Sequence, residues 1–318
     1  MALIIRKKAP HSRVGRFRSI TARRAYTEAY DDAFSALPAP SSTHDIPTTF
    51  GTVRAYSWSA LNPSSRAPVI LLPGRAAATP MWYENIPELV KNRPVIALDM
   101  LGDAGMSQQR MPFRSTRDHG TWLREVQTRL APGGAHVVGH SFGGSTAAAF
   151  ARAHPEIVTS LTLLEPVLTV AFPPLRMMLW TTLFSLPVLP QAWRATALAR
   201  VGGSDDEDAG ALGRMISLGV EEFRATLPVP RPMSTDQLAR LTMPVYVGLA
   251  EHHSLAGRPS TAQRARAALP NSEVTIWSGT THSLPMQVPV QLAQILDDFW
   301  THAEEHDRRP ADNSQPNR

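Results

Sequence analysis

The sequence of 318 residues predicts an α/β fold in which helices cover both faces of a mostly parallel central sheet. Short, uniformly apolar segments recur along the chain without the alternation of apolar and polar residues that a half-exposed strand shows. This pattern is typical of strands buried on both faces. Segments with a helical spacing of apolar residues separate them. Because strands alternate with helices, we expect parallel strands joined by right-handed crossovers.

Eight segments are predicted to be strands. The first two lie on either side of Gly51, and the third ends at Pro73 and Gly74. In chain order the predicted strands are Thr48–Phe50, Thr52–Trp58, Val69–Leu72, Val95–Leu98, His136–Val138, Leu161–Leu164, Val245–Leu249 and Val274–Trp277.

Six segments are predicted to be helices. In the first, Ser19–Leu37, apolar residues recur at spacings of three and four. Ser19 or Thr21 is a candidate N-cap, and Pro38 with Pro40 ends the helix. The other predicted helices are Met81–Val90, Thr116–Leu130, Ser145–Ala153, Ser260–Leu269 and Val288–His302.

A segment of about seventy residues interrupts the alternation of strands and helices. It is rich in Leu, Met, Trp and Pro and has no clear buried strand, so we expect an inserted helical cap at 167–237. The predicted core then comprises 45–166 and 238–305, preceded by a basic arm and docking helix at 1–44 and followed by a disordered tail at 306–318.

The charge of the chain is concentrated at its N-terminus. Eight of the basic residues lie in residues 1–24, where there is no acid, so the overall net charge of +5 becomes −3 for the rest. The basic residues lack interleaved aromatics or a known motif, so a solvated arm is expected and nucleic-acid binding is not. The acidic run Asp205–Asp208 lacks the spacing of a calcium loop and predicts a solvated loop.

Composition excludes several classes of protein. The chain has no cysteine, which rules out disulfides, zinc–thiolate sites and a cysteine nucleophile. No run of about 18 uncharged apolar residues is free of proline. The nearest, Met177–Trp193, contains Pro187 and Pro190. We therefore expect a soluble, cytoplasmic protein, with membrane-surface association through Met177–Trp193 and the basic arm as a less favoured alternative.

The strongest chemical signal is the run Gly139–Gly144, which reads GHSFGG. It follows an apolar strand and precedes an alanine-rich helix, which is the setting of a nucleophile elbow. Gly139 and Gly143 leave room for the tight turn, and Ser141 is the predicted nucleophile. The backbone N–H of Phe142 is then placed to receive an oxyanion.

A serine nucleophile needs a base, and His282 is the best placed of the eleven histidines. It lies after the last predicted strand and before the last helix. The order serine, acid, histidine along the chain suits this architecture.

These motifs resemble the α/β-hydrolase fold superfamily, and more closely its bacterial carboxylesterase-type members. The resemblance rests on Leu72-Pro73-Gly74 through Met81-Trp82-Tyr83, on the segment 99–107 (DMLGDAGMS) and on GHSFGG. It implies a serine hydrolase of small-molecule carboxylic esters with an apolar group, which forms an acyl-enzyme on Ser141. It also implies a second oxyanion N–H from Arg75, although Pro73 stands where relatives carry histidine.

Two carboxylates are candidates for the acid of the triad, Glu165 and Glu251. The family usually places it after the strand equivalent to Val245–Leu249, where this chain has His253 at the expected position and Glu251 beside it. Glu165 ends the preceding strand, and some members of the superfamily use an acid there. Both strand ends lie on the rim of the site. We therefore favour Glu165, keep Glu251 as the alternative acid, and leave open that no acid works.

Neither a metal nor a cofactor is expected. The adjacent His252 and His253 point to opposite sides in an extended segment, which suits chelation poorly. Two alternative functions remain open. The same site could cleave lactones, thioesters or carbon–carbon bonds or act as a perhydrolase, or the scaffold could be a non-catalytic binding protein, which the departure at His253 motivates.

Overall fold

The computed structural model describes residues 14–62, 65–179, 210–257 and 259–307. The strands in these residues are β1 (Arg16–Phe17), β2 (Ser42–Thr48), β3 (Gly51–Trp58), β4 (Val69–Leu72), β5 (Val95–Leu98), β6 (Gln108–Gln109), β7 (Ala135–His140), β8 (Val158–Leu164), β9 (Phe223–Arg224), β10 (Val245–Ala250) and β11 (Ser272–Trp277). The helices are α1 (Ile20–Phe34), α2 (Ile86–Leu89), α3 (Arg117–Leu130), α4 (Phe142–Ala153), α7 (Gly210–Glu222), α8 (Thr235–Leu238), α9 (Ser260–Ala268), α10 (Leu284–Gln287) and α11 (Pro289–Asp307), with the 3₁₀ helices η1 (Thr79–Trp82) and η2 (Pro155–Ile157).

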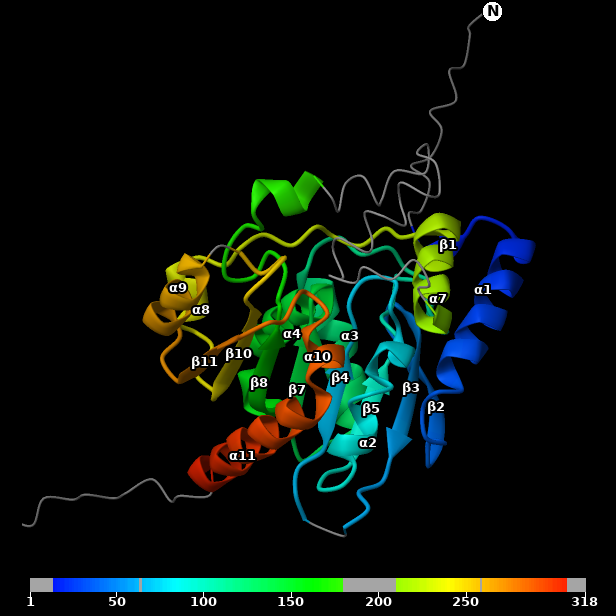
Figure 1. The fold of residues 1–318 in the computed structure, drawn as a ribbon. Coiled ribbons are helices and arrows are strands. Elements are labelled where there is room, and N and C mark those ends of the chain that lie inside the picture. Colours follow the sequence, from blue (N-terminus) through cyan, green and yellow to red (C-terminus); the bar gives the residue numbers. More distant parts are fainter. Residues whose placement is uncertain (1–13, 63–64, 180–209, 258, 308–318) are drawn as a thin grey trace, which may run out of the picture.

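Within the described residues one nine-stranded sheet forms the centre of the molecule, and helices lie on both of its faces (Figure 1). The strand order is β11-β10-β8-β7-β4-β5-β3-β2, with β6 paired to β3. Neighbouring strands from β11 to β5 are parallel, whereas β3 runs antiparallel to both β5 and β2. The predicted α/β architecture with a mostly parallel sheet is therefore confirmed.

The sheet separates two buried hydrophobic clusters. One lies between the sheet and α3, α4 and α9 and includes Trp122; the other lies between the sheet and α1, α2 and α11 and includes Trp300. Successive residues of a strand point to opposite faces. Accordingly, Val137 packs into the first cluster and Val138 into the second. This two-sided burial accounts for the uniformly apolar strands of the sequence.

The prediction of a strand at Thr48–Phe50 is wrong, because Thr49 and Phe50 form the turn between β2 and β3. Thr48 pairs with Gly51, which has a φ of 147°. Strand β2 is an edge strand in which Ile46 is the only buried residue, so it carries almost no apolar signal. Since β2 begins at Ser42, the central sheet starts before the boundary expected at residue 45.

The prediction of one helix over Met81–Val90 is also wrong. The structure has the short elements η1 and α2 there, because Pro87 has no N–H to continue a helix and fits only its first turn. Helix α4 begins at Phe142 instead of Ser145, and α11 extends five residues beyond the predicted end at His302.

Helix α7 lies beside α1 at the edge of the molecule (Figure 1). A Cβ on Gly219 of α7 would lie 3.0 Å from Ala104 Cβ and 3.2 Å from Ala76 Cβ, so α7 also contacts the loops after β4 and β5. Of the expected cap, only 167–179 and 210–237 are described. The acidic run and residues 1–13 of the basic arm lie outside the described residues.

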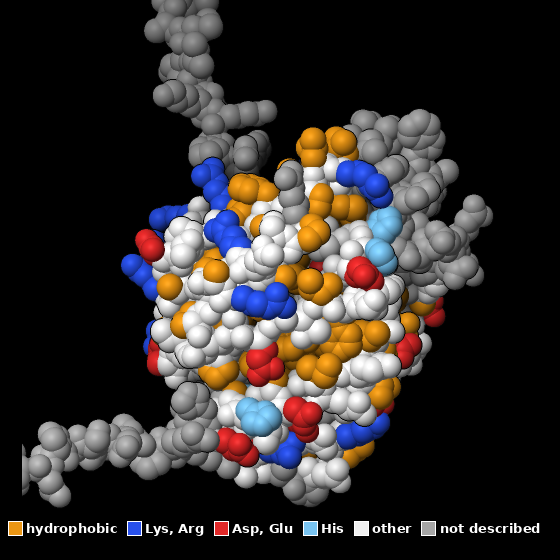
Figure 2. All heavy atoms as spheres, turned by 60° about the vertical axis from the view of Figure 1, so that its left-hand side comes forward, with side chains coloured by type: hydrophobic (Ala, Val, Ile, Leu, Met, Phe, Trp, Pro, Cys, Tyr) orange, Lys and Arg blue, Asp and Glu red, His pale blue; other side chains and the backbone are white. Residues whose placement is uncertain are grey.

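Charged side chains of both signs are interspersed on the face in Figure 2, which brings forward the side of β11 and α9. The residues drawn in colour there form no continuous basic patch. No helix in the described part of the chain combines the length and the apolar character needed to cross a membrane.

Arg93 lies near the amino end of β5 and connects it to α11 through hydrogen bonds and ion pairs. Its side chain is only 1% exposed, and its Nε lies 2.7 Å from Asp297 Oδ1. Its Nη1 pairs with Glu304, and its Nη2 donates to Thr301 Oγ1 at 3.1 Å. Glu304 Oε1 also lies 3.1 Å from His136 Nε2 on β7. Because a buried charge is costly without partners, the ionised form of Glu304 stabilises the network by pairing with the buried Arg93.

We expect Glu304→Gln to reduce the amount by which the free energy of unfolding decreases between pH 7 and pH 3. Burial raises the pKa of Glu304, but hydrogen bonds with His136, Arg93 and the Ala67 N–H lower it by more than burial raises it. The net effect is a pKa lowered from 4.5 to about 2. Since the folded state holds the lower pKa, this stabilisation is present above pH 4.5 and is lost as the pH falls toward about 2. Urea midpoints measured from pH 7 to pH 3 should fall less in the variant. The exposed neighbour Glu305→Gln is the control, and equal acid dependence in wild type and Glu304→Gln would contradict the prediction.

Candidate active site

Ser141 occupies a sharp turn between β7 and α4. Its φ is 54° and its ψ −117°, a strained conformation for a residue with a side chain. A Cβ on Gly139 would lie 2.4 Å from the Gly143 carbonyl oxygen, and one on Gly143 would lie 2.3 Å from the Leu72 carbonyl oxygen. No larger residue fits at either position, so the two glycines allow the turn that presents Ser141 at the carboxyl edge of the sheet.

His282 reaches Ser141 from the loop between β11 and α10. Its Nε2 lies 2.9 Å from Ser141 Oγ, and both residues are buried. The two positions are 141 residues apart in the chain. They meet because the carboxyl ends of parallel strands lie on one edge of the sheet.

Glu165 is the carboxylate next to His282. It directly follows β8 with a φ of 49°, and its Oε2 lies 3.0 Å from His282 Nδ1. It is fully buried, and its oxygens also accept hydrogen bonds from Ala250 N at 2.7 Å, Ser254 Oγ at 2.8 Å and Leu255 N at 2.9 Å. These partners orient the carboxylate toward the imidazole.

Glu251, the alternative acid, does not contact His282. It is exposed, and its Oε2 accepts hydrogen bonds from Gly279 N at 2.8 Å and Ser278 Oγ at 3.0 Å. The bond from Gly279 is the main cause that lowers the pKa of Glu251. Of the two candidates, the structure therefore brings only Glu165 to the histidine.

The two expected oxyanion donors lie in the turns after β4 and β7. Neither the Arg75 nor the Phe142 backbone N–H has a hydrogen-bond partner among the described residues. The Arg75 side chain pairs with Asp103 (Nε to Oδ2, 3.2 Å), which also accepts from Ala76 N at 3.0 Å. Asp103 thus anchors the loop on which the Arg75 N–H lies.

Two contacts of the site had no signal in the sequence. Ser254 donates its hydroxyl to Glu165, and His140 lies with its Nε2 2.8 Å from the His282 carbonyl oxygen. Each contact joins residues more than 80 positions apart in the chain. The sequence therefore gives no indication of either contact. His253 has a φ of 51° and forms no hydrogen bond with Ser141 or His282. No cluster of three metal-binding side chains occurs in the described residues.

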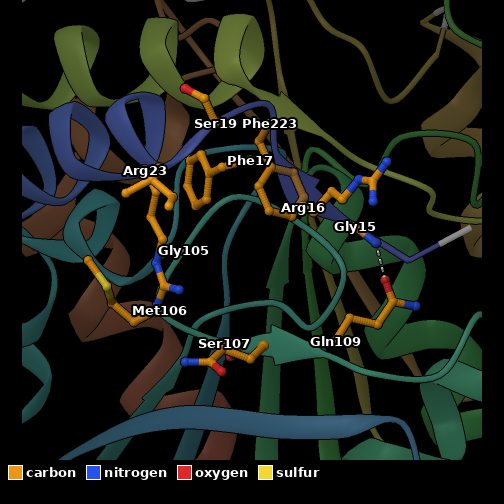
Figure 3. A pocket seen from close by; sticks show the side chains of 12 residues that line it. Gly15, Arg16, Phe17, Ser19, Arg23, Gly105, Met106, Ser107, Gln109 and Phe223 are labelled. Atoms are coloured by element: carbon orange, nitrogen blue, oxygen red, sulfur yellow. Dashed lines mark hydrogen bonds between the residues drawn. The ribbon is translucent and has the colours of Figure 1, made fainter.

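A groove of about 410 Å³ lies apart from these residues, between β1, the start of α1 and the 105–109 loop (Figure 3). In Figure 3 the side chain of Arg23 points toward Gly105 and Met106, and Gly15 N donates to Gln109 Oε1 at 2.7 Å. None of its lining residues belongs to the Ser141 site.

Comparisons with known proteins agree with this architecture. The family model described as alpha/beta hydrolase fold matches residues 67–204. Carboxylesterase YbfK of Bacillus subtilis (strain 168) is 24% identical over 291 residues, which cover 89% of this chain and 96% of the relative.

Two solved structures from Bacillus subtilis have the same fold. The crystal structure of carboxylesterase CesB (YbfK) superposes with a TM-score of 0.79 and 22% identity, covering 88% of this chain and 98% of that one. The crystal structure of naproxen esterase gives a TM-score of 0.78 and 22% identity, with coverages of 87% and 97%. The fold expected from the sequence motifs is therefore confirmed.

Proposed function

Since this chain is a carboxylesterase-like α/β hydrolase, we propose that it cleaves carboxylic esters through an acyl-enzyme formed on Ser141. The observation that carries the proposal is the continuous series of hydrogen bonds from Ser141 Oγ through the His282 imidazole to Glu165, at 2.9 and 3.0 Å. Nucleophile, base and orienting acid require this geometry.

In the proposed reaction, Ser141 Oγ bonds to the ester carbonyl carbon while His282 Nε2 takes the hydroxyl proton. The N–H groups of Phe142 and Arg75 stabilise the negative oxygen that forms. The carbon–oxygen bond to the alcohol then breaks, and the alcohol leaves with the proton from His282. Water next attacks the acyl-enzyme, His282 takes a proton from it, and Ser141 regains that proton as the carboxylic acid leaves. Glu165 holds the imidazole and stabilises its charged form throughout.

The proposed substrates are small esters with an apolar group. The Leu-, Met- and Trp-rich sequence of the expected cap supports an apolar pocket. The names of the two Bacillus relatives, a carboxylesterase and a naproxen esterase, support esters as the substrate class.

A fluorophosphonate probe and a panel of chromogenic esters test the proposal. We expect the probe to label Ser141 and the wild-type protein to hydrolyse short-chain esters. Labelling together with activity on lactones or thioesters alone would change the substrate class but keep the mechanism. No labelling at high probe concentration and no turnover would instead favour a binding protein on this scaffold.

A further inference from the structure

His140 is a buried histidine that the proposed reaction does not use. It is the last residue of β7, directly before Ser141, and it pairs with Leu164 of β8 in the sheet. Its Nε2 lies 2.8 Å from the carbonyl oxygen of His282, and the two imidazole ring centres are 4.9 Å apart. The side chain thus connects the strand that carries the nucleophile to the backbone of the base.

The chemistry of this contact determines the tautomer of His140. A carbonyl oxygen only accepts hydrogen bonds, so His140 Nε2 must carry the hydrogen and donate it. Burial, and secondarily the neighbouring His282, lower the pKa of His140 to about 3. The ring therefore remains neutral at neutral pH, and Nδ1 carries no hydrogen.

The other ring nitrogen of His140 faces the loop after β4. Nδ1 is buried without a partner among the described residues, and a Cβ on Gly74 would lie 3.1 Å from it and 3.3 Å from Ser141 Cβ. The ring consequently fills the space between this loop, which carries the Arg75 N–H, and the loop of His282. A side chain at position 140 can shift little without moving one of them.

The position of the His282 imidazole depends on its backbone as well as on its ring contacts. Its ring nitrogens contact Ser141 and Glu165. Because the residue lies in a loop, those contacts stay aligned only if the loop does. Among the described residues, His140 is the hydrogen-bond donor that holds the His282 carbonyl.

We propose that His140 is a positioning residue, which fixes the backbone of His282 so that its Nε2 stays aligned with Ser141 Oγ. This inference rests on the proposed ester hydrolysis. Its neutral ring also suits the reaction, because a cation beside His282 would oppose the imidazolium that forms there.

The matched variants His140→Gln and His140→Met test the proposal in the full-length protein. The two side chains have similar length and shape, but only glutamine offers an N–H to the His282 carbonyl. We expect His140→Met to lower kcat about 10- to 100-fold with KM within about twofold, because a small misplacement of a catalytic group reduces the rate steeply. His140→Gln should retain kcat within about fivefold.

Rates are expressed per active site titrated with the fluorophosphonate, so unfolded protein does not count. His140→Asn is a second variant, whose amide is too short for the carbonyl, and it should resemble His140→Met. Equal kcat per active site in the Gln and Met variants would overturn the positioning role of His140 and leave the proposed ester hydrolysis intact. If the Met variant does not fold, the same conclusion follows from equal kcat in the Gln and Asn variants. A wild-type protein that neither reacts with the probe nor hydrolyses esters would overturn the proposed function and this inference with it.

Discussion

Replacing Ser141 with alanine is expected to lower kcat about 10⁶-fold on the best ester of the panel. The substitution removes the oxygen that forms the acyl-enzyme, while His282, Glu165 and both oxyanion donors remain. Residual hydrolysis then depends on water attacking a bound ester directly. Burst-phase kinetics and fluorophosphonate labelling should both be lost, since each requires the same oxygen.

Ser145→Ala is the matched control for this variant. Ser145 lies one turn further along α4, is also buried, and donates its hydroxyl to the Val167 carbonyl. Its loss should cost about 1 kcal/mol of stability and leave kcat within about fivefold. Full turnover by Ser141→Ala, or an equal loss in both variants, would show that Ser141 is not the nucleophile.

Glu165→Gln is expected to lower kcat about 10⁴-fold with little change in KM. In one orientation the glutamine NH₂ faces His282 Nδ1 and the Leu255 N–H. His282 Nδ1 must then accept a hydrogen bond, so the imidazole hydrogen lies on Nε2. In this tautomer Nε2 cannot accept the Ser141 proton. In the other orientation the NH₂ faces the Ala250 N–H and the Ser254 hydroxyl. Either way a buried donor meets a donor, and the stabilising negative charge is gone.

Glu251→Gln separates this effect from a general disturbance of the loops. Glu251 is exposed and supports the segment before His282 through Gly279 and Ser278, so its variant should keep kcat within about threefold. Circular dichroism and urea unfolding establish that both variants are folded. If Glu251→Gln lost the larger activity and Glu165→Gln the smaller, the acid would be the residue after β10.

In the central sheet, burial of a strand determines how well its sequence predicts it. Strands β4, β5, β7, β8 and β10 are buried on both faces, so the short apolar runs within them predicted these strands in the right order. The prediction failed at β2, where the edge position leaves most side chains outside the core. A strand buried on both faces needs apolar side chains, and these make it recognisable in the sequence. The edge strand β2 is held mainly by backbone hydrogen bonds and has no such pattern.

The local chain by itself determined the turn at Ser141, because Gly139, Gly143 and the following helix act within a few residues of it. Chain order further indicated His282 as the base. Which carboxylate meets His282 was decided only by the tertiary structure. Glu165 and Glu251 both follow strands that end on the same edge of the sheet, and side-chain direction and distances set by packing bring one of them within 3.0 Å and leave the other in solvent.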